Sequence, residues 1–255
     1  MNTSRSKSLL TAGLIAASLL SVAAAEPNGD QILRQMCKKL ATAQTFSFEA
    51  KREMDAALIP IQNMAVEARI SVSVQRPNKI AAQAVTKAGV RRFIFDGRTL
   101  TIVDEKKNLY TTVPMRTTID GLVDQLDVKY GFVPPLGEFA VSNPYTEFTR
   151  EAQSVKYLGT EKIGTGFLGG GVECYHLGLK GKEADAELWI GVSDQLPREL
   201  VATFHREGNP QLRITFSTWN LAAHMTASDF AFTPDKGAMK IEMLTTAKMQ
   251  ATLNH

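Results

Sequence analysis

The chain has 255 residues, 44% of them hydrophobic, and its 29 basic and 26 acidic residues leave a formal net charge of +3. Two of the basic residues, Arg5 and Lys7, lie at the very start, so the remainder of the chain is nearly neutral. A charge balance this even, with no concentrated basic segment, excludes nucleic acid as an expected partner.

The first 25 residues have the three zones of a cleavable secretory signal peptide. Arg5 and Lys7 provide the positive charge, residues 9–20 form a short apolar run, and three successive alanines end at Ala25. An uncleaved membrane anchor is the alternative, but a bilayer span needs about 20 strongly apolar residues. This stretch is shorter and rich in alanine and serine. We therefore expect cleavage near Ala25, a periplasmic location and no transmembrane segment in the mature chain.

The mature chain, residues 26–255, has the length of a single β-rich domain. It begins with a helix, because apolar side chains recur at helical spacing through residues 30–42. Asp30 is the expected N-cap, since a carboxylate there can accept from the free N–H groups of the first turn.

After this helix the apolar period changes to two, which is typical of strands with one apolar face. The clearest alternation covers residues 66–75, and Asp96-Gly97 predicts a tight hairpin turn. Roughly eleven strands are expected. They come from twelve candidate segments: 46–51, 66–75, 79–86, 91–96, 99–103, 109–113, 154–162, 172–179, 186–190, 198–205, 211–218 and 239–244.

A helical interlude separates the two groups of strands. Thr117 or Thr118 can cap a helix that carries Ile119 and Leu122, and a second short helical segment follows Pro134. The other connections are too short for parallel crossovers, so the strands should form an antiparallel meander. We predict a mainly β (α+β) fold: one curved sheet forming a half-open barrel, with helices and an apolar cavity on its concave side.

No motif for catalysis, a metal or a cofactor stands out. The stretch beginning at Gly164 matches G-x-G-x-x-G, but a strand pattern follows it where a nucleotide site needs a helix, so a hairpin loop is expected. The histidines lack metal-ligand spacing, and His176 and His205 are interpreted as structural residues. The segment around Ser193 breaks the G-x-S-x-G pattern. No cofactor is expected.

The apolar strand faces are the remaining candidate site. Their side chains can be ordinary core, or they can line a cavity that holds a lipid-like chain by shape and apolar area. The candidate cavity residues are Phe46, Phe48, Ile70, Val72, Phe93, Phe95, Leu200, Phe204, Leu212 and Phe216.

Two cysteines, Cys37 and Cys174, remain in a chain expected to reach an oxidising compartment. They can form a disulfide, which would contribute about 4–5 kcal/mol in the chain-entropy model. Two buried free thiols are the equally weighted alternative.

An ordered series of short phrases is similar to a family of predicted periplasmic proteins of unknown function grouped with LolA/LolB-like lipoprotein carriers. The phrases are RPNKI from Arg76, FDGRTLTI from Phe95, NLYTTVP from Asn108, DAELWI from Asp185, LPR from Leu196 and FAFTPDKGA from Phe230. The resemblance implies a half-open barrel of about eleven strands with helices over an apolar cavity. Ala186 and Asp235 stand where this family commonly has an aromatic residue and a second proline.

The leading functional hypothesis is a binding or carrier protein for a lipid, an acyl chain or a lipoprotein anchor. An envelope sensor or scaffold that acts through protein contacts is the first alternative. An enzyme with a site assembled from distant strands is the second, and it lacks any local motif. A monomer is expected.

Overall fold

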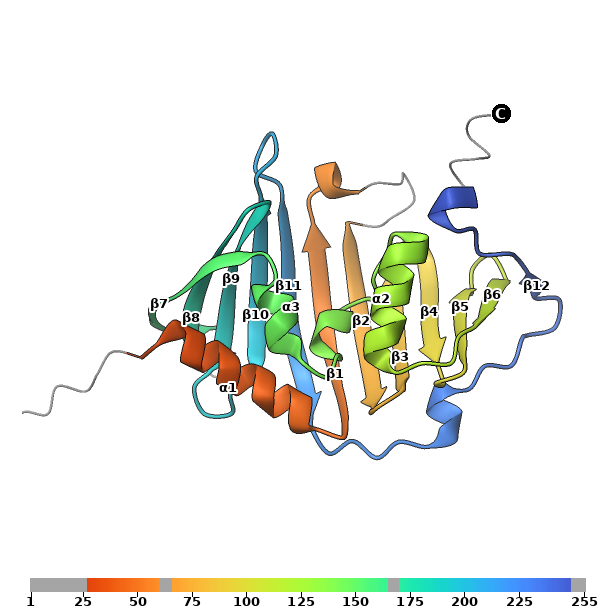
Figure 1. The fold of residues 1–255 in the computed structure, drawn as a ribbon, viewed down its shortest axis with the longest axis horizontal. Coiled ribbons are helices and arrows are strands. Elements are labelled where there is room, and N and C mark those ends of the chain that lie inside the picture. The colour runs from red at the N-terminus through yellow and green to blue at the C-terminus, as the bar shows by residue number, and fades with distance from the viewer. Residues whose placement is uncertain (1–26, 60–65, 165–169, 249–255) are drawn as a thin grey trace, which may run out of the picture.

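The computed structural model describes residues 27–59, 66–164 and 170–248. Within them the strands form one open, curved sheet, with helices lying across one of its faces (Figure 1). The strands are β1 (Thr45–Met54), β2 (Glu67–Gln75), β3 (Lys79–Thr86), β4 (Gly89–Phe95), β5 (Thr99–Asp104), β6 (Leu109–Pro114), β7 (Ala152–Ile163), β8 (Val172–Gly181), β9 (Ala184–Gly191), β10 (Pro197–Phe204), β11 (Gln211–Asn220) and β12 (Met239–Lys240). Helical segments include α1 (Gly29–Thr42), α2 (Ile119–Tyr130), α3 (Pro144–Thr149), η1 (Ala56–Leu58), η2 (Gly137–Phe139) and η3 (Ala227–Phe230).

The sheet is built from two antiparallel meanders joined through its first strand. Its order is β12-β6-β5-β4-β3-β2-β1-β11-β10-β9-β8-β7. β1 pairs with β2 on one side and with β11 on the other, both antiparallel. The predicted fold class is confirmed, with twelve strands in place of about eleven and a sheet that does not close.

The last strand differs from its prediction. A strand over residues 239–244 was expected within the antiparallel meander, but only Met239 and Lys240 pair, and they pair parallel with β6. A long connection leads from β11, in the middle of the sheet, past the ends of the strands to β12 at the edge (Figure 1). Such a connection allows a parallel approach, because no tight turn fixes the direction.

The three α-helices begin at side-chain caps. The side-chain oxygen of Asn28 accepts from the backbone N–H of Gln31 at 3.3 Å, so Asn28, rather than the expected Asp30, caps α1. Asp30 lies in the first turn and pairs instead with Arg34 at 2.7 Å. Thr118 caps α2 as predicted, and α3 was not predicted. None of the described helices is long and apolar enough to cross a bilayer.

The Asp96-Gly97 turn is present between β4 and β5. Asp96 Oδ1 accepts from the backbone N–H groups of Arg98 and Thr99, both at 2.8 Å. Gly97 has φ of +91°, and a Cβ at this position would lie 2.3 Å from Asn78 Nδ2. Glycine is therefore required here by both backbone conformation and space.

Aromatic side chains fill the middle of the concave side. The Phe48 ring lies 4.4 Å from the Trp219 ring and 5.8 Å from the Phe216 ring, between centroids. Phe139 of η2 packs on the same cluster, 4.9 Å from Phe216. This cluster joins the sheet to η2 and forms a packed aromatic core at the middle of the sheet.

Candidate functional site

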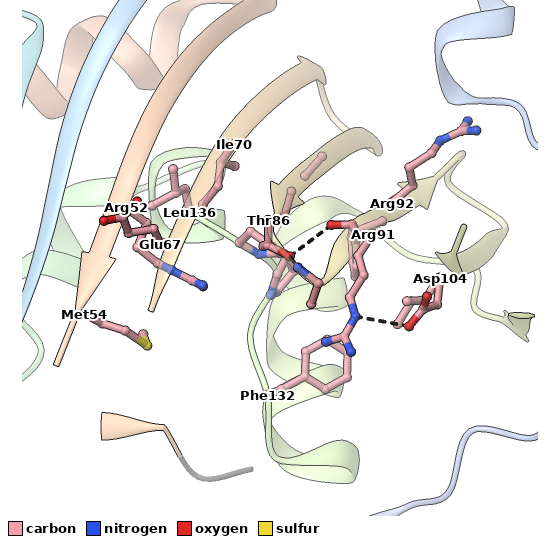
Figure 2. A pocket seen from close by; sticks show the side chains of 18 of the residues that line it. Arg52, Met54, Glu67, Ile70, Thr86, Arg91, Arg92, Asp104, Phe132 and Leu136 are labelled. Carbon is pink, nitrogen blue, oxygen red and sulfur yellow. Dashed lines mark hydrogen bonds and ion pairs between the residues drawn. The ribbon is translucent and has the colours of Figure 1, made fainter. Parts of the chain in front are cut away.

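A cavity of about 1,320 Å³ lies on the concave side beside the aromatic cluster. Its walls are formed by β1–β5 and β11 of the sheet and by the segment from Phe132 to Glu138, which follows α2 (Figure 2). Typical small-molecule pockets measure roughly 300–1,000 Å³. This cavity therefore has space for a larger, chain-like ligand.

Apolar side chains form most of the wall. The inward-facing residues of the neighbouring strands pair across the sheet, with Ile70 opposite Ala84 and Ala82 opposite Phe93. Alternation places all four on the concave face, because side chains two apart in a strand share a face. The small alanine side chains of β3 leave space above their part of the sheet. The aromatic rings of β1 and β11 fill the neighbouring part. The apolar wall residues are Met54, Val66, Ile70, Ala82, Ala84, Ala88, Phe93, Ile102, Phe132, Val133, Pro134, Pro135, Leu136, Leu212 and Ile214.

The wall opposite the sheet turns at Leu136. This residue has φ of +57°, a left-handed conformation that is uncommon for a residue with a Cβ. Leu136 is nevertheless buried, and it leads directly into η2. Its left-handed turn brings both the Leu136 side chain and that of Glu138 to the cavity.

Glu138 places a carboxyl group in this apolar wall. Burial, together with the nearby negative charge of Glu147, raises the pKa of Glu138 from an ordinary value of 4.5 to about 7. Desolvation disfavours the charged form of a carboxyl group. Near neutral pH, Glu138 therefore exists as a mixture of neutral and charged forms.

The mouth of the cavity is rich in basic side chains. The lining includes six basic residues (Arg52, Lys87, Arg91, Arg92, Lys106 and Lys107) and three acidic ones (Glu67, Asp104 and Glu138). Arg91 pairs with Asp104 at 3.5 Å, and Arg92 pairs with Glu105 at 3.8 Å and points away from Arg91 in Figure 2. The lysines lie in the β3–β4 and β5–β6 turns and are exposed.

The ten predicted cavity residues fall into three groups. Ile70, Phe93 and Leu212 line the cavity. Six others belong to the packed core and do not line it: Phe46, Phe48, Val72, Phe95, Leu200 and Phe216. Phe204 lies at the end of β10 outside both groups, with the Arg206 guanidinium 5.6 Å from its ring centroid. Whether any of them contacts a ligand stays a prediction.

Sequence reasoning missed several parts of the wall. Ala82 and Ala84 were overlooked because small residues give a weak apolar signal, although their size creates the space. Phe132, Leu136 and Glu138 lie outside regular strands, where no alternation marks an inward side. The pair of prolines before Leu136 was the one available signal, since it predicts a turn.

The disulfide alternative is not supported. Cys37 of α1 and Cys174 of β8 are both buried free thiols. Burial raises the pKa of Cys37 to about 12 and that of Cys174 to about 11. Both side chains are therefore held as protonated, unreactive groups of the interior.

The other sequence motifs behave as structural elements. β7 and β8, on either side of the glycine-rich stretch, pair antiparallel, so a strand follows this stretch as predicted; residues 165–169 lie outside the described residues. The His176 ring stacks on Trp189 at 4.3 Å between centroids and contacts Glu161 and Glu187. Within the described part of the chain, no group of three or more potential ligands is placed to hold a metal ion.

The fold and site together define a class of protein: an open, curved antiparallel sheet with an apolar cavity between its concave face and its helices. The chain belongs to the family described as predicted periplasmic protein (DUF2092), whose model matches residues 29–244. The predicted periplasmic location is confirmed by this description. The proposed leader, residues 1–25, lies outside the described residues and stays a prediction.

Solved structures with a similar arrangement have low sequence identity. An uncharacterized conserved protein from Thermus thermophilus has a TM-score of 0.49 at 10% identity, covering 83% of this chain and 97% of that one. A LolA superfamily protein from Nitrosomonas europaea has a TM-score of 0.37 at 13% identity, covering 81% and 98%. The Pseudomonas aeruginosa MucA/MucB complex gives 0.45 at 14% identity, covering 79% and 61%. No curated protein matches the chain.

Proposed function

We propose that this protein is a non-enzymatic periplasmic binding or carrier protein that holds a lipid, an acyl chain or a lipoprotein anchor in its cavity. The observation that supports the proposal is the cavity of about 1,320 Å³ between Phe93 of the sheet and Leu136 of the facing segment. Its wall is mainly apolar, which suits a hydrocarbon chain better than a polar metabolite.

The energy available from such a wall is sufficient for binding. Each methylene transferred from water contributes about 0.8 kcal/mol, so ten buried methylenes contribute about 8 kcal/mol. Part of this is lost to the ordering of the chain and of the protein. The remainder is compatible with reversible binding, which a carrier requires because it must also release its ligand.

The proposal is tested with the neutral apolar dye N-phenyl-1-naphthylamine and two tryptophan variants of β3. Ala84→Trp places a large ring in the cavity wall, while Gln83→Trp places the same ring at the exposed neighbouring position, one residue away on the opposite face. We expect the wild type and Gln83→Trp to bind the dye and Ala84→Trp to lose most of this binding.

Equal dye binding by both folded variants would contradict the proposal. No dye binding by the wild type, either directly or after extraction of bound lipid, would favour the alternative of a sensor or scaffold that acts through protein contacts. Crosslinking in cells would then be the appropriate search for a partner.

A further inference from the structure

The mouth of the cavity carries a concentrated positive charge that the chain as a whole lacks. Outside residues 1–25 the sequence has 27 basic and 26 acidic residues. At the cavity, three exposed lysines gather in two turns: Lys87 between β3 and β4, and Lys106 and Lys107 between β5 and β6. An apolar ligand does not need these charges.

The two turns are in direct contact. A Cβ at Gly89, the first residue of β4 after the turn that holds Lys87, would lie only 2.8 Å from the Cβ of Lys106 in the second turn. Gly89 has φ of +132°, and the Thr86 hydroxyl donates to its carbonyl at 3.0 Å. The second turn is held by Asp104, whose Oδ1 accepts from the Lys107 N–H at 3.1 Å. The backbone of the two turns therefore keeps the lysines together.

The lysine charges are not neutralised by the protein. Across the residues described, no carboxylate lies within ion-pair distance of the ammonium groups of Lys87, Lys106 or Lys107. The two acidic residues just before Lys106 in the chain, Asp104 and Glu105, pair with Arg91 at 3.5 Å and with Arg92 at 3.8 Å. Three like charges in one place repel one another, and an anion between them would relieve that repulsion.

We propose that the ligand is an acyl lipid with a phosphate headgroup, whose chain enters the cavity while Lys87, Lys106 and Lys107 hold the phosphate at its mouth. This inference rests on the proposed function and narrows its ligand. A lipoprotein anchor has no anionic group beside its acyl chains and leaves the lysines without a partner. A phospholipid supplies both the hydrocarbon and the charge.

The test compares two lipids with the same chain. Lysophosphatidic acid and monoacylglycerol, each with one oleoyl chain, differ only in the phosphate, and both are titrated as competitors of N-phenyl-1-naphthylamine below their aggregation concentrations. We expect the phosphate lipid to bind about tenfold more tightly at low salt, since each exposed ion pair between a lysine and the phosphate contributes only modestly to the binding free energy. The preference should shrink as ionic strength rises, because salt screens exposed charges.

The variant Lys87→Gln/Lys106→Gln/Lys107→Gln tests whether these three lysines bind the phosphate. It should retain dye and monoacylglycerol binding and lose the preference for phosphate. The matched control is Lys38→Gln/Lys162→Gln/Lys182→Gln, which removes the same charge at exposed positions on α1, β7 and the β8–β9 turn, outside the cavity lining. The control should keep the preference.

The outcomes separate this inference from the proposed function. Equal affinity of the wild type for the two lipids, or a preference that survives in the triple variant, would overturn the phosphate assignment and leave the carrier proposal intact. Failure of both lipids to displace the dye would overturn the carrier proposal and the phosphate assignment with it.

Discussion

The guanidinium of Arg76 donates to the backbone carbonyl of Ala140 at 2.6 Å, joining the end of β2 to the end of η2, which follows the wall segment of the cavity. The same side chain donates to the carbonyls of Ala43 at 3.1 Å and Leu40 at 3.3 Å, at the C-terminal end of α1. A cation at this end of a helix is favoured by the exposed carbonyls and the helix dipole. One half-buried side chain therefore joins the sheet, the first helix and the end of η2.

Replacing Arg76 should destabilise the protein strongly. In Arg76→Ala the three carbonyls lose a charged donor inside the protein, so we expect the free energy of unfolding to fall by about 2–4 kcal/mol. Arg76→Lys should lose less stability, because its ammonium group keeps the positive charge. Some loss should remain, because an ammonium cannot reproduce the planar fork of donors that the guanidinium provides. Urea unfolding measures both variants. Arg98→Ala, at an exposed arginine, is the control and should stay within about 0.5 kcal/mol of wild type.

Glu138 should make stability depend on pH. Its pKa is about 7 in the folded protein against an ordinary 4.5, so the native state holds the proton more tightly than the unfolded chain does. The contribution of Glu138 is therefore fully present below about pH 4.5 and is lost as the pH rises through about 7. The loss across this pH range should be about 3 kcal/mol.

The variant Glu138→Gln removes this titration. Urea unfolding at about pH 5 and about pH 8 should show the variant gaining stability relative to wild type at the higher pH. Glu67→Gln, an exposed carboxylate at the mouth of the same cavity, should show no such gain. An identical pH dependence in Glu138→Gln and wild type would show that this carboxyl group is not buried as described.

Phe93 and Phe204 should behave differently when replaced by aspartate. Phe93 lines the cavity, so Phe93→Asp places a charge in the apolar wall and should abolish binding of N-phenyl-1-naphthylamine. Phe204 is not part of the lining, so Phe204→Asp should bind the dye as wild type does. Circular dichroism checks that both variants are folded. Loss of binding in Phe204→Asp alone would place the site elsewhere on the sheet.

The cysteines should be free and unreactive in the native protein. Thiol titration of unreduced mature protein should find two thiols after denaturation and almost none before it, because Cys37 and Cys174 are buried and their pKa values are raised. A count of zero thiols in denaturant would contradict this and indicate a disulfide.

Most strands, with β12 as the exception, and the inward side of the clearly alternating ones could be predicted from the sequence, because alternation depends only on local chain geometry. Ile70, Phe93 and Phe48 were all correctly placed on an apolar face. The pairing of β1 with β11 could not be predicted, since partners this distant leave no local pattern. It decides which residues meet across the middle of the sheet.

The division of the concave face into a packed part and an open part also could not be predicted from the sequence. Phe48 and Phe93 have the same alternation, yet Phe48 is packed against Trp219 while Phe93 faces the cavity. The difference arises from the helical segments above them: η2 inserts Phe139 over the Phe48 side, and small alanines lie beside Phe93. Periodicity identifies a face but does not measure what covers it.

The most direct test of the central claim is native mass spectrometry, with lipid extraction, on mature protein purified from the periplasm without detergent. The account predicts a bound, extractable lipid in the wild type and much less of it in Ala84→Trp. A mass without ligand in the wild type, unchanged after incubation with oleoyl lysophosphatidic acid and monooleoylglycerol, would contradict it.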